Sequence, residues 1–109
     1  LKIYNIVVKQ TGEPPIIIDS KDLLLHPKII IKKLCKSLGI VFSSKMLKWP
    51  KGRRKTDGVW AKYWYESVEK STGFKKYKKK KITLNTNEKN IYNECLPFYN
   101  RLFQLRIKP

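Results

Sequence analysis

The sequence predicts a mostly helical α/β chain with one buried strand, the later part of a parallel-sheet domain. Apolar residues recur at helical spacing in four or five segments, and one short continuous apolar run suits a strand buried on both faces. No second strand is available, although the backbone groups of a buried strand must be hydrogen-bonded. We therefore expect residues 1–109 to form a single incomplete domain whose other strands lie upstream of Leu1.

The first segments carry clear stop signals. Residues 1–10 show helical spacing, Gly12 suits the position just after a helix, and Pro14-Pro15 prevents continuation. The predicted strand is Ile16-Ile17-Ile18, three β-branched residues without alternation, closed by Asp19.

Two helical segments should follow. Ser20 is predicted to cap a short turn through Leu25, and Pro27 suits the first position of a helix that ends before Gly39. The apolar stripe of that helix consists of Ile30, Ile31, Leu34, Cys35 and Leu38.

The middle of the chain combines a loop with an aromatic helix. Ser43 or Ser44 is expected to cap a turn through Lys48, and residues 49–58 are predicted to be a loop. A helix should then run to Gly73. Its buried side is predicted to carry Trp60, Tyr63, Trp64, Ser67 and Val68.

The last third begins with a basic run. Residues 75–81 hold six lysines around Tyr77, a pattern typical of a solvated loop with diffuse attraction for anions. A final helix is predicted over residues 87–107, and Pro97 should either kink it or start a second helix.

Charge narrows the classes of partner. The formal net charge is +17, which favours phosphate, nucleic acid or an anionic membrane as ligand. No apolar run reaches the roughly 20 residues of a membrane-spanning helix, and we expect a cytoplasmic protein.

Cys35 and Cys95 each lie on a helical apolar stripe, so we expect them to remain unbonded, with Cys35 in the core. The chain begins with Leu1, which predicts a piece of a longer protein.

The residue types for several chemistries are missing. Neither glycine-rich nucleotide-binding pattern occurs. His26 is the single histidine, and its place before Pro27 at a helix start favours a structural role. One histidine and two distant cysteines cannot form a tetrahedral zinc site, so we predict no metal and name no catalytic residue.

The most informative segment precedes the predicted aromatic helix. Lys51, Arg53 and Arg54 cluster there, and Gly52 and Gly58 allow the backbone to approach a ligand closely. Basic side chains ahead of a helix N-terminus form a plausible phosphate site. Either Trp60 or Trp64 supports a nucleotide base, or both simply pack. The competing interpretation is a solvated basic loop capped by Asp57, with the tryptophans in the core.

Three stretches carry a family resemblance: Pro-Pro-Ile-Ile-Ile-Asp-Ser at 14–20, Met-Leu-Lys-Trp-Pro-Lys-Gly at 46–52 and Asp-Gly-Val-Trp-Ala-Lys-Tyr-Trp-Tyr at 57–65. Residues 1–74 resemble bacterial sulfotransferase-like proteins, some of which are labelled branched-chain aminotransferase-like. The resemblance implies a P-loop-like α/β fold that takes sulfate from 3′-phosphoadenosine 5′-phosphosulfate and transfers it to a small-molecule acceptor.

The resemblance also implies a role for the basic loop. A basic, tryptophan-bearing loop of sulfotransferases closes over the donor's 3′-phosphate, although the cytosolic pattern places glycine before aspartate, whereas here Asp57 precedes Gly58. The phosphosulfate loop and the catalytic groups are expected upstream, so residues 1–109 alone should be inactive. The predicted donor-binding residues are Lys51, Gly52, Arg53, Arg54, Gly58 and Trp60.

Two other function classes remain open. A basic nucleic-acid-binding module is supported by the charge and by Trp60, Tyr63 and Trp64 near lysines. A membrane-surface or purely structural fragment is the third, with residues 75–81 attracted to anionic lipid.

Overall fold

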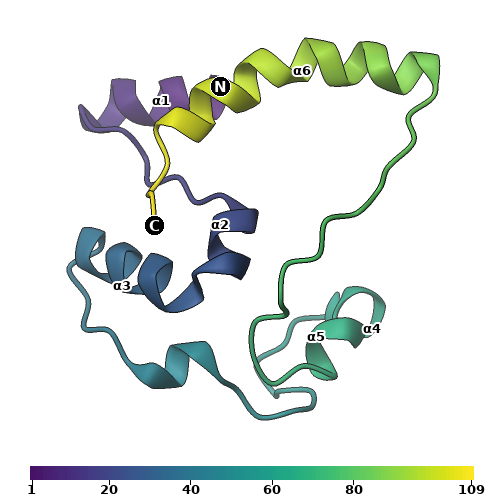
Figure 1. Ribbon diagram of the computed structural model, residues 1–109. Helices are drawn as coiled ribbons and strands as arrows, with labels where there is room; N and C mark the ends of the chain where they lie inside the picture. Colours follow the sequence, from purple (N-terminus) through teal and green to yellow (C-terminus); the bar gives the residue numbers. More distant parts are fainter.

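A computed structural model describes all 109 residues, and all of its regular elements are helical (Figure 1). The chain forms an open ring in which the long last helix is joined to the middle helices by an extended segment. The elements are α1 (Lys2–Thr11), α2 (Ser20–Leu25), α3 (Pro27–Ser37), the 3-10 helix η1 (Ser44–Leu47), α4 (Ala61–Trp64), α5 (Glu66–Glu69) and α6 (Thr86–Gln104).

The predicted buried strand at residues 16–18 is wrong, and with it the parallel sheet of a P-loop-like α/β fold. The chain contains no strand, and its single β-bridge joins Lys48 to Gly73. Three β-branched residues favour extended backbone, but a strand also needs a neighbour along its length. Here one backbone bond is made, from the Ile107 N–H to the Ile17 carbonyl at 2.9 Å, and Ile16 stays 40% exposed.

Local signals set the ends of the first helices as predicted. Gly12 follows α1 in the left-handed conformation, at φ 75°, and its N–H donates to the Val8 carbonyl. Pro27 opens α3. The cap of α2 is one residue earlier than expected, because the carboxylate of Asp19, not Ser20, accepts the N–H groups of Lys21 and Asp22.

The small core lies where α3 packs against α2 and η1. Ile30 is fully buried and Cys35 is 2% exposed, which confirms the core position predicted for Cys35. The Cys35 sulfur lies 3.6 Å from the sulfur of Met46, in η1. Cys35 and exposed Cys95 are both free thiols, as predicted.

The aromatic helix predicted after the loop is shorter and differently packed. Two single-turn helices, α4 and α5, meet at Tyr65, which leaves the helical conformation. Trp60, Tyr63 and Trp64 are 67%, 68% and 73% exposed, so the predicted burial of this side is wrong. The aromatic side chains stay exposed because no other part of this chain covers them. The buried residue in this region is Ala61.

The last helix is long and continuous. An Asn85–Glu88 capping box starts α6, and the helix passes through Pro97 without starting a second one. Residues 74–85 before it have no regular structure, in line with the loop expected at the lysine run. No helix of the chain combines the length and the apolar character that crossing a bilayer requires.

Candidate functional site

The basic loop at residues 49–58 is fastened at its start to the segment that follows α5. The Trp49 N–H donates to the Thr72 carbonyl at 3.1 Å, next to the antiparallel bridge of Lys48 with Gly73. The Gly52 N–H donates to the Glu69 carbonyl at 2.8 Å. These bonds join residues 17 to 25 positions apart and give the loop a defined place.

Trp49 is the aromatic residue that holds this arrangement together. Its indole N–H donates to the Ser71 hydroxyl at 3.0 Å, and the hydroxyl in turn donates to the Val68 carbonyl. Its ring meets Phe74 edge-on, with ring centroids 5.4 Å apart. Trp49 lines the cavity beside the loop, whereas Trp60, the tryptophan predicted to bind the donor, does not. The available signal for Trp49 was its position directly before Pro50, at the start of the loop.

Residues 54–57 form a tight turn closed by an aspartate. The Asp57 carboxylate accepts the Arg54 N–H at 2.8 Å, and the Asp57 N–H donates to the Arg54 carbonyl at 3.1 Å. Asp57 therefore stabilises the loop itself and does not cap the helix. Gly52 has φ 111°, a conformation in which a side chain would be strained.

The basic side chains of the loop have no acidic partner. The two ion pairs of the chain, Lys70 with Glu66 and Arg106 with Asp22, lie elsewhere. Lys51, Arg53, Arg54 and Lys55 are all exposed and make no ion pair. The loop thus presents four cationic side chains that are free to bind an anion.

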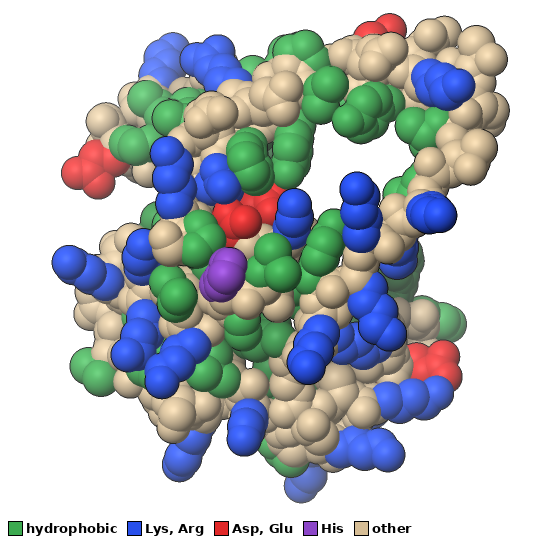
Figure 2. Space-filling view, in the orientation of Figure 1, with side chains coloured by type: hydrophobic (Ala, Val, Ile, Leu, Met, Phe, Trp, Pro, Cys, Tyr) green, Lys and Arg blue, Asp and Glu red, His purple; other side chains and the backbone are tan.

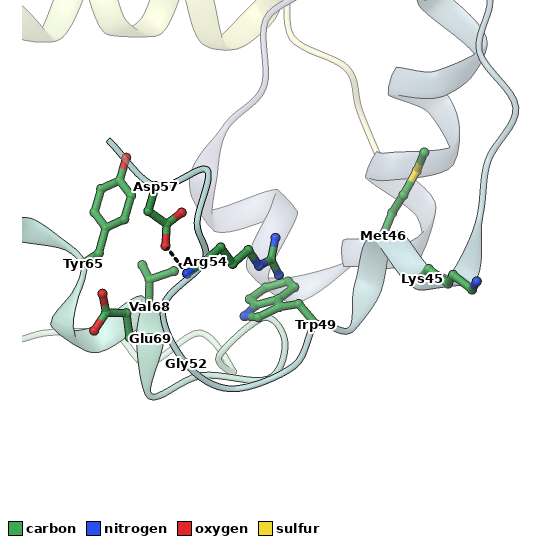
Figure 3. Close-up of a pocket in the computed structure, with 9 residues that line it drawn as sticks. All are labelled: Lys45, Met46, Trp49, Gly52, Arg54, Asp57, Tyr65, Val68 and Glu69. Carbon is green, nitrogen blue, oxygen red and sulfur yellow. Dashed lines mark hydrogen bonds between the residues drawn. The ribbon is translucent and has the colours of Figure 1, made fainter. Parts of the chain in front are cut away.

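A cavity of about 360 Å³ lies beside the loop (Figure 3). Of the six predicted binding residues, it is lined by Gly52 and Arg54, whereas Lys51, Arg53, Gly58 and Trp60 lie outside it. The Arg54 side chain points toward the Trp49 indole in Figure 3. The other lining residues are Lys45, Met46, Trp49, Asp57, Tyr65, Val68 and Glu69.

The helix N-terminus after the loop should contribute little to anion binding. The helix after the loop, α4, has only four residues, so few peptide dipoles add up at its start. Any binding of an anion must therefore come from the side chains and backbone of the loop.

A second polar cluster joins the two ends of the chain. The Tyr99 hydroxyl donates to Asp19 at 2.9 Å, and the Arg106 guanidinium donates to Asp22 at 2.6 Å. The hydrogen bond to the Asp19 carboxylate raises the pKa of Tyr99, because it stabilises the neutral phenol. The four groups form two pairs, which tie Tyr99 of α6 and Arg106 just after it to Asp19 and Asp22. No three His, Cys, Asp or Glu residues lie close enough together to hold a metal ion.

Comparison with known proteins gives the family. The family model described as a sulfotransferase domain matches residues 7–105 of this chain. The chain belongs to the sulfotransferase domain family. This confirms the sulfotransferase part of the sequence-based resemblance.

The relatives of this sulfotransferase-domain chain are much longer proteins. Branched-chain-amino-acid aminotransferase-like proteins 2 and 1 of Arabidopsis thaliana are each 42% identical to it over 93 residues. The match covers 85% of this chain and 17% of each relative, and both relatives come from a plant. A search of solved structures found no match.

Proposed function

We propose that the loop at residues 51–58 binds the 3′-phosphate of 3′-phosphoadenosine 5′-phosphosulfate in a sulfotransferase. Membership of the sulfotransferase domain family supports the sulfate donor as ligand. The observation that carries the proposal is the group of four exposed cationic side chains without a carboxylate partner, next to a cavity.

The loop residues have the properties that a phosphate requires. Arg54 reaches the cavity and presents a planar fork of donors, which matches two phosphate oxygens. Lys51 and Arg53 add positive charge from outside the cavity. A Cβ added at Gly52 would meet no atom within 4 Å, so its need for glycine is conformational. Exposed Trp60 offers an apolar face for the nucleotide base.

The domain is proposed to be incomplete in residues 1–109. Few of its side chains are buried, and the chain spans 17% of the length of the relatives it matches. The acceptor site and the reacting groups are assigned to the rest of the protein. We therefore expect residues 1–109 alone to transfer no sulfate to alcohols or amines.

The test uses adenosine 3′,5′-bisphosphate and the full-length protein in titration calorimetry. The double variant Arg53→Ala/Arg54→Ala should bind it more weakly by about 1.5–3 kcal/mol, the usual contribution of hydrogen bonds to charged groups. The control, Lys79→Ala/Lys81→Ala, removes the same charge outside the loop and should retain affinity within a few-fold.

Adenosine 5′-monophosphate identifies the phosphate involved. The wild type should prefer the bisphosphate, and the loop variant should lose that preference. A loop variant that folds and keeps the preference would contradict the proposal. The single variants then show whether Arg53, which lies outside the cavity, contributes at all.

Binding of single-stranded nucleic acid is a second candidate function, favoured by one observation. Trp60, Tyr63 and Trp64 are exposed, and the Lys62 ammonium lies 4.7 Å from the Tyr63 ring centroid. If this function is correct, Trp60→Ala/Trp64→Ala should weaken binding to a single-stranded oligonucleotide by about 1–3 kcal/mol per stacked base. Unchanged binding in the variant would exclude stacking on these residues.

A further inference from the structure

The lysine-rich segment and Leu24 of α2 line an open hollow of about 840 Å³, separate from the loop cavity. Its basic lining consists of Lys75, Lys76, Lys78 and Lys80, and its apolar lining of Leu24, Tyr77 and Ile82. We call it the basic hollow. In Figure 2, blue side chains gather along the extended segment with apolar green atoms between them.

The consecutive residues Lys75, Lys76 and Tyr77 line this hollow, and from Lys78 onward alternate side chains of the segment face it. Lys78, Lys80 and Ile82 line it, whereas Lys79 and Lys81 do not. Successive side chains of extended backbone point to opposite sides, so the period of two explains the selection. Residues 78–82 are therefore divided into an inward set, Lys78, Lys80 and Ile82, and an outward set, Lys79 and Lys81.

The segment is held in place at two points. Upstream, Phe74 packs edge-on against Trp49, and Gly73 is bridged to Lys48. Farther along, the Lys21 ammonium of α2 lies 5.7 Å from the Tyr77 ring centroid, and Tyr77 is half-buried. These contacts keep Tyr77 as a wall of the hollow.

The positive charge of the hollow is not neutralised by the chain. None of its four lysines makes an ion pair. The nearby acids of α2 are already engaged, Asp22 with Arg106 and the capping residue Asp19 with Tyr99. The exposed lysines keep their donors free, and the apolar side chain of Ile82 is 72% exposed.

We propose that the basic hollow binds an anionic amphiphile, a small molecule with a phosphate, sulfate or carboxylate head and an apolar body. The inward lysines hold the head, and Leu24, Tyr77 and Ile82 contact the apolar body. This site goes beyond the proposed donor loop and does not depend on it.

The experiment measures binding of monomeric decyl phosphate, below its micelle concentration, to residues 1–109 by calorimetry. Inward Lys78→Ala/Lys80→Ala should weaken binding at least tenfold. Outward Lys79→Ala/Lys81→Ala removes the same charge from the same segment and should weaken it less than threefold, because screened attraction is weak. Inorganic phosphate, which has no apolar body, should bind wild type at least tenfold more weakly.

Equal losses in the two double variants would overturn the proposal, since they would show diffuse charge attraction only. Inorganic phosphate binding as tightly as decyl phosphate would also overturn it. Amide chemical shifts of residues 75–82 give a second readout on the wild type: shifts centred elsewhere would place the ligand outside the hollow and reject the site. Vesicles containing anionic phospholipid distinguish a bilayer lipid from a free molecule as the ligand. Tight wild-type binding to the vesicles that depends on the inward lysines identifies a bilayer lipid. Absence of such binding identifies a free molecule.

Discussion

Arg106 connects the end of the chain to its beginning. Its guanidinium bonds the Asp22 carboxylate and the Phe103 carbonyl, each at 2.6 Å, and lies 3.3 Å from the Phe103 ring centroid. The side chains of Arg106 and Asp22 are each only 12% exposed. Removing one partner of such a pair leaves an uncompensated charge with little access to water.

Asp22→Ala is therefore expected to lower the free energy of unfolding by about 2–4 kcal/mol. This loss is somewhat smaller than that for a fully buried ion pair, because both side chains keep slight exposure to water. Lys70→Ala, which breaks the exposed Lys70–Glu66 pair, should cost less than about 1 kcal/mol. Urea denaturation measures the free energy of unfolding of each variant. The coupling energy between Asp22 and Arg106 follows from Asp22→Ala, Arg106→Ala and the double variant Asp22→Ala/Arg106→Ala. A coupling energy near zero would show that the pair does not hold α6.

Tyr99 predicts a dependence of stability on alkaline pH. Its pKa is raised by the hydrogen bond to Asp19, so folding favours the neutral phenol. The stabilisation is fully present below the ordinary tyrosine pKa near 10 and is lost as pH rises through the higher folded value. Tyr99→Phe should thus melt below wild type at pH 8, and the difference should vanish at strongly alkaline pH. Tyr92→Phe, on the same helix without such a bond, is the control for the titration of lysines in this pH range. A lower melting temperature of Tyr99→Phe that persists at high pH would contradict the role assigned to the Tyr99–Asp19 hydrogen bond.

At the scale of elements, the packing of α3 depends on one stripe of its surface. Ile30 is fully buried and Ile29, its neighbour in sequence, is 45% exposed. The periodicity of 3.6 residues places them on different faces, so one contributes to the core and the other does not.

Ile30→Ala should lower the free energy of unfolding by about 2–5 kcal/mol, the usual cost of a large-to-small change in a core. Ile29→Ala removes the same atoms from the partly exposed face and should cost less than about 1 kcal/mol. Equal losses in urea denaturation would mean that the helix packs through a different face in solution.

The whole molecule exposes more surface than a compact domain of its mass. Its accessible surface is 9698 Å², against roughly 6,300 Å² for a compact 12.9 kDa monomer. Its radius of gyration is 17.0 Å, against about 13 Å for a compact domain of this length. The surplus supports the proposal that residues 1–109 are an incomplete domain.

An exposed aromatic patch should bind a hydrophobic dye. Trp60→Ser/Tyr63→Ser/Trp64→Ser is expected to reduce anilinonaphthalene sulfonate fluorescence of residues 1–109 and to leave its melting temperature nearly unchanged, because these side chains bury little area. Lys62→Ser, within the same turn, serves as the control. A large drop in melting temperature of the aromatic variant would mean that the patch is packed in solution.

Much of the local structure was predictable from the sequence, because it depends on residues a few positions apart. Gly12 ended α1, Pro27 opened α3, and the 3.6-residue period placed Cys35 in the core. The position of the basic loop followed from its composition. These features arise from backbone conformation and one-sided hydrophobicity, which a short stretch of chain specifies by itself.

Tertiary structure decided what requires a distant partner. Residues 16–18 form no strand, because no neighbouring strand pairs with them. The aromatic side of α4 is exposed because no facing surface covers it. The loop owes its place to Glu69 and Thr72, and α6 to an ion pair between residues 84 positions apart. No local pattern encodes such contacts, since their energy depends on which surfaces meet after the chain has folded.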